Sequence, residues 1–158
     1  MSKLLIIPLI FLNGLSLFGQ IEIETNYLDA NNWILMNKIS VRQFVNELIR
    51  PTDQPDNPSK HKYVLQTVGQ QDANWITKED VKFLIKLMDS KEDAKCIMQI
   101  KSSYMPTVEK PTLGDQVILL INAYRQKLNF PYELTLCGDF GGKERSEIKR
   151  WWKKEKSK

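Results

Sequence analysis

Two stretches of the chain place apolar residues on one face of a helix, directly after a residue suited to capping that helix. Ser40 precedes residues 41–50, and Gln43 stands three positions after it, which is the spacing of a capping box. Thr77 precedes residues 78–89 in the same way. A cap followed by a 3.6-residue period predicts a helix over each stretch and limits the fold more than any other feature.

The same periodicity extends over much of the remaining chain. It predicts helices over residues 91–104 and 115–128, and a basic C-terminal helix over 143–156. Residues 63–75 fit either a strand or a helix, and we favour a helix. Residues 132–137 are compatible with one short extended segment. The expected fold class is therefore all-α, with five to six helices packed as antiparallel hairpins.

Residues 20–158 are expected to form a single helical domain, because their number suits one ordinary domain with its own core. Residues 51–62 contain three prolines and no large apolar side chain, which predicts an exposed loop. His61, the one histidine of the chain, lies between two lysines in that loop. This setting favours an ordinary surface histidine over a catalytic one.

Residues 1–19 have the composition of a secretory signal peptide. Lys3 supplies a positive charge, an apolar run follows, and Gly19 ends it with a small residue. The run is short for a membrane-spanning helix, although an uncleaved anchor or a buried helix stays an alternative. The ending "LFGQ" is similar to that of exported Gram-negative bacterial proteins. We expect cleavage near Gly19 and a periplasmic or secreted protein.

The net charge of +4 is distributed unevenly along the chain. Residues 143–158 contain 8 Lys and Arg against 3 Asp and Glu, whereas residues 20–142 contain 14 against 16. Nucleic-acid-binding domains carry a basic face on the body of the domain. This chain concentrates its cations in the tail, so we expect no nucleic-acid partner.

Cys96 and Cys137 are the only cysteines. In an oxidising compartment they would form a disulfide, and in a reducing one they would be two buried thiols. We favour the disulfide because the N-terminus predicts export. A metal site is disfavoured because a single histidine cannot complete one around two cysteines.

The stretch "CGDFGGKER" resembles a phosphate-binding loop only superficially. That loop requires Ser or Thr directly after its lysine, and Glu144 follows Lys143 here. The spacing from Gly138 to Gly142 is also one residue short. We interpret the glycines as allowing positive φ in a turn, and we expect no cofactor.

Paired carboxylates do not indicate catalysis in this chain. The pairs are Glu79 with Asp80, Glu92 with Asp93 and, farther apart, Asp115 with Glu133. Acids at helix starts are explained by capping and by the helix dipole. We therefore assign no catalytic, cofactor-binding or metal-binding residue.

Three tryptophans are candidate anchors, either in the core or on the surface. Trp75 precedes the cap of the helix at 78–89 and suits the core or a groove. Trp151 and Trp152 lie on one helical face with Ile148. We expect this face to pack on the domain. Contact of the basic helix with a membrane surface is a lesser alternative.

The stretch "NWITKEDVKFLIKLMDSKEDAKCIMQIKSSYMP", together with the second cysteine and "EIKRWWKK", resembles small exported bacterial proteins built as HEAT-like helical hairpin arrays. The resemblance covers residues 74–154, about half of the chain. It implies an all-α body and a disulfide, and it assigns no catalytic or binding residue.

Three functions are compatible with these features. The first is an exported, non-enzymatic module for protein–protein interaction, inhibitor-like or immunity-like in kind. The second is a small periplasmic or secreted hydrolase, which would need an acid–base pair that the sequence does not reveal. The third is an envelope-associated protein whose basic helix contacts anionic lipid. We favour the first, with an unidentified protein as its partner.

Overall fold

A computed structural model describes residues 26–51, 64–103 and 111–157 of the chain. Three features named above lie wholly or largely outside these residues: the expected signal peptide 1–19, His61, and all but the first residue of the expected loop 51–62.

The described residues contain a four-stranded mixed sheet. Its strands are β1 (Ile34–Leu35), β2 (Val64–Val68), β3 (Cys96–Gln99) and β4 (Thr135–Leu136), in the spatial order β1-β2-β3-β4. The pairs β1–β2 and β2–β3 are parallel, and β3–β4 is antiparallel. The fold is therefore α/β. Both the all-α expectation and the resemblance to HEAT-like arrays are wrong.

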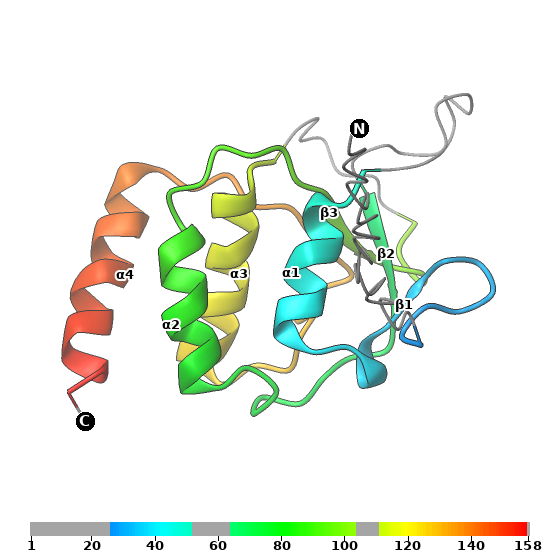
Figure 1. The fold of residues 1–158 in the computed structure, drawn as a ribbon, viewed down its shortest axis with the longest axis horizontal. Coiled ribbons are helices and arrows are strands. Elements are labelled where there is room, and N and C mark those ends of the chain that lie inside the picture. Colours follow the sequence, from blue (N-terminus) through cyan, green and yellow to red (C-terminus); the bar gives the residue numbers. More distant parts are fainter. Residues whose placement is uncertain (1–25, 52–63, 104–110, 158) are drawn as a thin grey trace, which may run out of the picture.

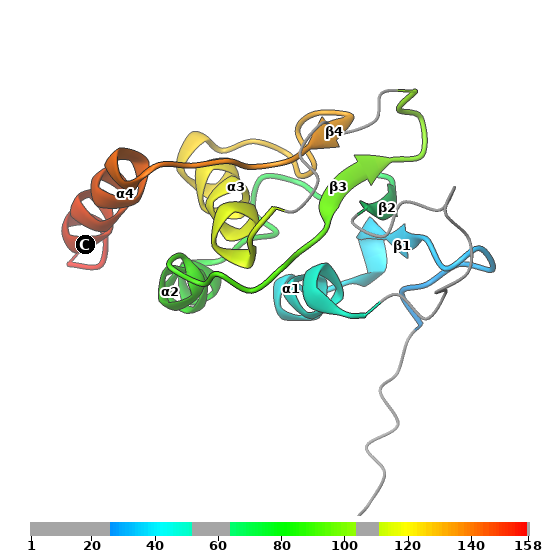
Figure 2. The same ribbon diagram turned by 90° about the horizontal axis from the view of Figure 1, so that it is seen from above.

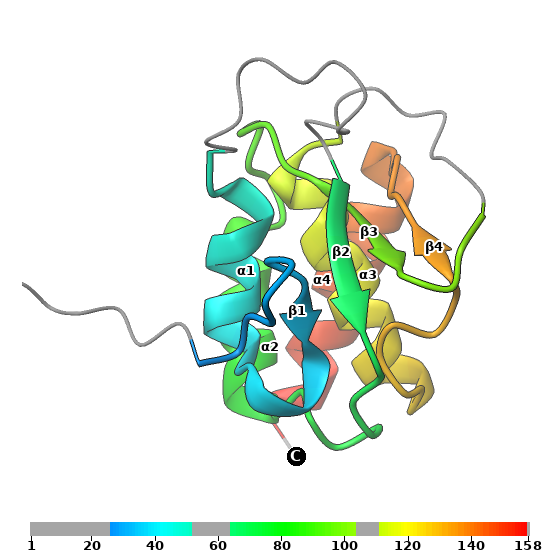
Figure 3. The same cartoon turned by 90° about the vertical axis from the view of Figure 1, so that its right-hand side faces the viewer.

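Four α-helices accompany the sheet. They are α1 (Val41–Ile49), α2 (Lys78–Leu87), α3 (Leu113–Gln126) and α4 (Gly142–Glu155), and a short 3-10 helix, η1 (Met36–Lys38), precedes α1. Figures 1 and 2 show all four α-helices on one side of the sheet, with α4 farthest from it. Figure 3 shows the opposite face of the sheet, on which no α-helix lies within the described part of the chain.

The helices form where local start signals precede them. Ser40 and Gln43 make the predicted capping box at the start of α1. Thr77 and Asp80 make a second box at the start of α2. Thr112 caps α3 by accepting a hydrogen bond from the backbone of Asp115. The helices expected at 41–50, 78–89 and 115–128 are confirmed within a few residues at each end.

The helix expected over residues 91–104 is wrong, because β3 occupies Cys96–Gln99. All four residues of β3 are buried, which is usual for an interior strand of a sheet. A strand buried on both faces shows no alternation of apolar and polar residues. Three apolar residues at helical spacing (Ala94, Ile97 and Met98) were therefore a misleading signal.

The helix favoured over residues 63–75 is also wrong, because β2 runs from Val64 to Val68. Its burial alternates along the strand, with Leu65 and Thr67 buried and their neighbours partly exposed. Valine and threonine fit a pleated strand well once neighbouring strands are present. The extended segment allowed near 132–137 contains β4.

The core lies between the sheet and the helices, and α3 is its central element. Ten of the 14 residues of α3 are buried. They pack with apolar side chains of α1, α2 and the strands, among them Phe44, Leu84 and Ile97. Such a core positions α3 firmly, and α3 in turn supports the C-terminal helix. Among the described residues no helix is long and apolar enough to cross a membrane.

Candidate functional site

The basic helix α4 forms the edge of the molecule opposite the sheet (Figures 1 and 2), and its inner face packs on the domain. Ile148 is its only fully buried residue. Trp151 and Trp152 are partly buried against the core, with ring centroids 5.9 Å apart. Trp151 meets the ring of Tyr124 on α3 at 6.2 Å and lies 5.2 Å from the guanidinium of Arg125. The two tryptophans thus contact the domain rather than pointing away from it.

A buried ion pair joins α4 to the start of α3. Arg145 donates to the carboxylate of Asp115, and the side chains of this pair are 11% and 10% exposed. The same guanidinium donates to the carbonyl of Met88 after α2. Asp115 also accepts from the backbone N–H of Phe140, at 3.2 Å, and from the hydroxyl of Thr112. One carboxylate therefore links α3, α4 and the segment before α4.

Two further ionic contacts hold α4 at its margins. Lys149 lies 2.7 Å from a carboxylate oxygen of Asp89, and both side chains are largely exposed. Glu144 lies 3.6 Å from Arg125 and accepts a hydrogen bond of 3.4 Å from Asn122. The inward charges of α4 are therefore neutralised by groups of the domain.

The outer face of α4 carries cations that are exposed and not paired with the described residues of the domain. Lys143, Arg150 and Lys154 are exposed, and their spacing of seven and four residues places them in one row along the helix. We call these three residues the basic row. Lys153 is exposed beside the row. Within the part of the chain that the structure describes, none of the row has a carboxylate oxygen within 4.0 Å, and Glu147 lies on the same stripe, four residues after Lys143 and three before Arg150.

The glycines of the segment before α4 have a different role from the one expected. Neither Gly138 nor Gly141 has a positive φ. A Cβ on Gly138 would lie 2.8 Å from the carbonyl oxygen of Asp115 and 2.7 Å from the ring of Phe140. Gly138 is required by this close approach, whereas a Cβ on Gly141 or Gly142 would meet nothing within 4 Å. No phosphate-binding loop is formed.

Cys96 and Cys137 form a disulfide, as the sequence predicts for an oxidising compartment. Ile97 pairs with Leu136 across β3 and β4, so the two cysteines lie side by side one step further along the strands. Their Cα atoms are 4.7 Å apart. Cys96 is fully buried and Cys137 is partly exposed.

Trp75 belongs to the core rather than to a surface site. Its ring stacks on Phe130 at 5.7 Å and meets the edge of Phe44 at 5.9 Å. Its indole N–H donates to the carbonyl of Ile39 at 2.9 Å. The polar atom of the indole is thus satisfied within the domain, and the core interpretation of Trp75 agrees with the structure.

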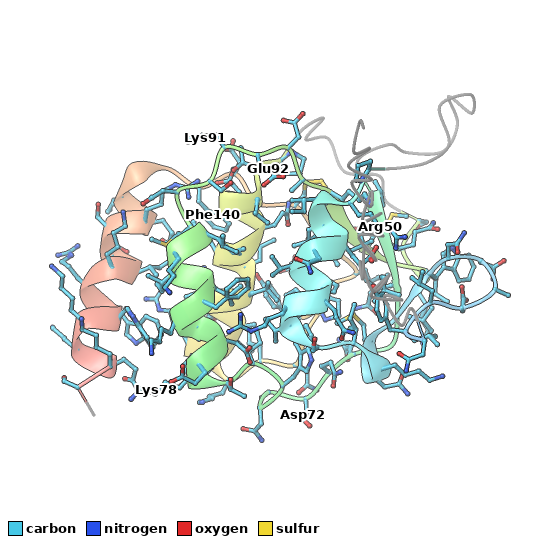
Figure 4. All side chains as sticks on the ribbon, viewed as in Figure 1. Arg50, Asp72, Lys78, Lys91, Glu92 and Phe140 are labelled. Carbon is cyan, nitrogen blue, oxygen red and sulfur yellow. A yellow bond between two sulfur atoms is a disulfide. The ribbon has the colours of Figure 1, made fainter. Side chains whose placement is uncertain are left out.

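The three carboxylate pairs lie in different settings among the described residues. Asp80 caps α2, and Glu79 is exposed next to Lys82. Figure 4 shows Glu92 beside Lys91 on the connection between α2 and β3, so this acid does not begin a helix. In the third pair, Asp115 is buried and Glu133 is exposed. No group of potential metal ligands occurs among the described residues.

A shallow hollow of about 400 Å³ lies at the end of the sheet. Its lining consists of Ser102, Ser103, Glu133, Leu134 and Thr135. The hydroxyls of Ser102 and Thr135 are 2.7 Å apart and bond to each other. Among the described residues, this lining contains one carboxylate, that of Glu133.

Comparison of the chain with family models, with curated proteins and with solved structures finds no match.

The basic row on α4 is the clearest group of unpaired surface charges among the described residues, and the sequence predicted the helix that carries it. The buried pair Arg145–Asp115 was not anticipated. Arg145 stands three residues before Ile148 on the inner helix face, and that spacing was the available signal.

Proposed function

We propose that the protein is a protein–protein interaction module that binds an acidic protein surface through the basic row of α4. The observation that carries the proposal is the contrast between the two faces of this helix. Arg145 and Lys149 face the domain and are paired with its carboxylates. Lys143, Arg150 and Lys154 face outward and have no such partner among the described residues.

The dimensions of the basic row suit a narrow acidic surface. Lys143 and Lys154 are eleven residues apart, which corresponds to about 16 Å along an α-helix. A partner would therefore present several carboxylates over a strip of that length. Exposed charges attract over a distance of roughly 8 Å at physiological ionic strength, so binding would weaken as salt increases.

An acidic protein fits this face better than a lipid bilayer does. A helix that lies in a membrane surface buries an apolar face among the lipid chains. The apolar residues of α4 are Ile148, Trp151 and Trp152, and they are engaged with the domain. The exposed side thus offers charge with little apolar area, which supports an electrostatic protein contact.

The direct test is binding of a fluorescent oligoglutamate peptide that spans about 16 Å, measured by anisotropy at low salt. The triple variant Lys143→Glu, Arg150→Glu, Lys154→Glu should bind about tenfold more weakly or worse. The matched control, Lys78→Glu, Lys82→Glu, Lys86→Glu, makes the same charge change on the exposed side of α2 and should bind like the unmodified protein. Equal losses in both variants would argue against a specific site.

A second measurement separates the protein partner from the lipid alternative. Vesicles containing phosphatidylserine or phosphatidylglycerol are titrated with the same three proteins. We expect weak binding that salt abolishes, with no shift in tryptophan fluorescence. Tight binding accompanied by a blue shift would favour the envelope-associated alternative and overturn the protein-binding proposal.

Export stays part of the proposed function and rests on the composition of residues 1–19. The test is expression of the full chain in a Gram-negative host, followed by N-terminal sequencing of the soluble periplasmic fraction. A mature chain that begins at or near Gln20 would support export. Intact protein confined to the cytosol would contradict it.

A further inference from the structure

The Cys96–Cys137 disulfide joins a buried residue to a partly exposed one. Cys96 begins β3 and is fully buried, whereas Cys137 follows β4 and is partly exposed. Thiol–disulfide exchange begins with the attack of a thiolate on one sulfur along an open path. The difference in residue exposure favours Cys137 over Cys96 as the point of attack by an external thiol.

Gln116 of α3 lies beside this sulfur and is fully buried. Its side-chain nitrogen is 4.0 Å from the sulfur of Cys137. Its side-chain oxygen has no hydrogen-bond partner within the residues that the structure describes. A buried amide oxygen without a donor disfavours the state that contains it.

Reduction of the disulfide would change the chemistry available to this amide. A thiol S–H is a donor, whereas a disulfide sulfur has no hydrogen to donate. In the dithiol form, the S–H of Cys137 becomes a donor beside the amide of Gln116, whose nitrogen lies 4.0 Å from that sulfur. The N–H of the same amide can donate to the sulfur while it is a thiolate. Gln116 therefore favours the reduced form relative to an apolar side chain of similar size.

We propose that Cys137 is a site of reversible thiolation by small monothiols and that Gln116 adjusts the stability of its disulfide. In the first step, the thiolate RS⁻ attacks the sulfur of Cys137. The bond Cys137–S–S–R forms, the Cys96–Cys137 bond breaks, and Cys96 leaves as a thiolate that takes a proton from water.

In the second step, another RS⁻ attacks the R-bearing sulfur. This step releases RSSR, and Cys137 leaves as a thiolate that is then protonated. Two RSH are oxidised and one protein disulfide is reduced, so the electrons balance. The proposal does not depend on the acidic partner of α4.

The first test uses the unmodified, folded protein and reduced glutathione as the thiol. The reaction is quenched with acid, and the mixed disulfide is located by peptide mass spectrometry. We expect the glutathionyl group on Cys137 under native conditions. Modification of Cys96, or modification only after urea is added, would overturn the proposal.

The second test measures the equilibrium of the disulfide with a dithiothreitol redox buffer in the variants Gln116→Met and Gln116→Leu. Removing the unpaired oxygen should make the disulfide about fivefold harder to reduce. Gln126→Met changes an exposed glutamine of the same helix and should have no effect. An unchanged or more easily reduced disulfide in the Gln116 variants would contradict the proposed role of Gln116. If neither variant folds, the site mapping in the unmodified protein still decides whether Cys137 is the site of thiolation.

Discussion

Arg145 of α4 and Asp115 of α3 form an ion pair whose side chains are about nine-tenths buried. Taking two charges out of water is costly, and the cost is offset only when both groups are paired and hydrogen-bonded. Both conditions are met, since the carboxylate also accepts from Phe140 and Thr112 and the guanidinium also donates to Met88. This pair is therefore the strongest polar link between the C-terminal helix and the core.

Removing one member of the pair should destabilise the protein substantially. We expect Arg145→Met to lower the free energy of unfolding by about 3 kcal/mol, because Asp115 would stay buried without its cation. Arg150→Met removes an arginine from the exposed side of α4 and should cost less than about 0.5 kcal/mol. Urea unfolding followed by circular dichroism measures both values. Similar small losses in the two variants would show that the pair contributes little.

Gly114, the second residue of α3, should tolerate no side chain. A Cβ at this position would lie 2.6 Å from the carbonyl oxygen of Met88 and 2.7 Å from that of Ser90. Backbone oxygens cannot move away cheaply, so Gly114→Ala should cost about 2 kcal/mol or more. Gly141→Ala is the matched control, because open space surrounds Gly141. Thermal unfolding should place the control within a few degrees of the unmodified protein, and an equally mild effect at Gly114 would contradict the expectation.

The disulfide should contribute stability through the chain that it closes. Cys96 and Cys137 are 41 residues apart, and closing a loop of that length disfavours the unfolded chain by about 4 kcal/mol. The double variant Cys96→Ala, Cys137→Ala should lose stability of that order while keeping its circular dichroism spectrum. The unmodified protein unfolded with reductant present should show a similar loss. If the free energy of unfolding falls by less than about 1 kcal/mol in both experiments, the crosslink contributes little to stability.

Tyr27 should make the protein sensitive to alkaline pH. Its hydroxyl donates to Glu47 at 2.7 Å, and the residue is 2% exposed. Burial, together with the hydrogen bond and negative charge of Glu47, raises the pKa of Tyr27 from 10.0 to about 12. The unfolded chain therefore loses this proton at lower pH than the folded chain. The corresponding stability is complete below pH 10 and should disappear as the pH rises to about 12.

Tyr132 should contribute to the same alkaline loss, since burial, followed by the charge of Glu133, raises its pKa to about 12. Stability measured by urea unfolding from pH 8 to pH 12 should fall less steeply in Tyr27→Phe and in Tyr132→Phe than in the unmodified protein. The double variant should be the flattest of the series. Parallel curves for all four proteins would exclude this origin of the pH dependence.

The helices of this fold were predictable because their signals are local. Ser40 and Thr77 lie next to the helices that they cap, and both capping boxes are present. The strands were not predictable in the same way, because a strand depends on partners that are distant in sequence. Val64 of β2 pairs with Cys96 of β3, and no pattern within either segment identifies the other.

The surface features were predictable in part. The spacing of Ile148 and Trp151 correctly placed the apolar side of α4 toward the domain. The buried pair between Arg145 and Asp115 joins groups 30 residues apart, and charge alone did not distinguish these two residues from solvated ones. The role of Gly138 was also missed, because close approach to Asp115 is a property of the folded chain only.

The position of the disulfide also determines how the molecule would respond to mechanical force. If the two ends of the chain were pulled apart, the segment between Cys96 and Cys137 could not extend while the bond is intact. At about 3.5 Å per residue, the crosslink excludes roughly 140 Å of contour length from the extensible chain. The helix α4 lies beyond the crosslink and would peel away without opening the loop that contains α3. Reduction would restore the hidden length, so the extension of a single stretched molecule would report the state of one covalent bond.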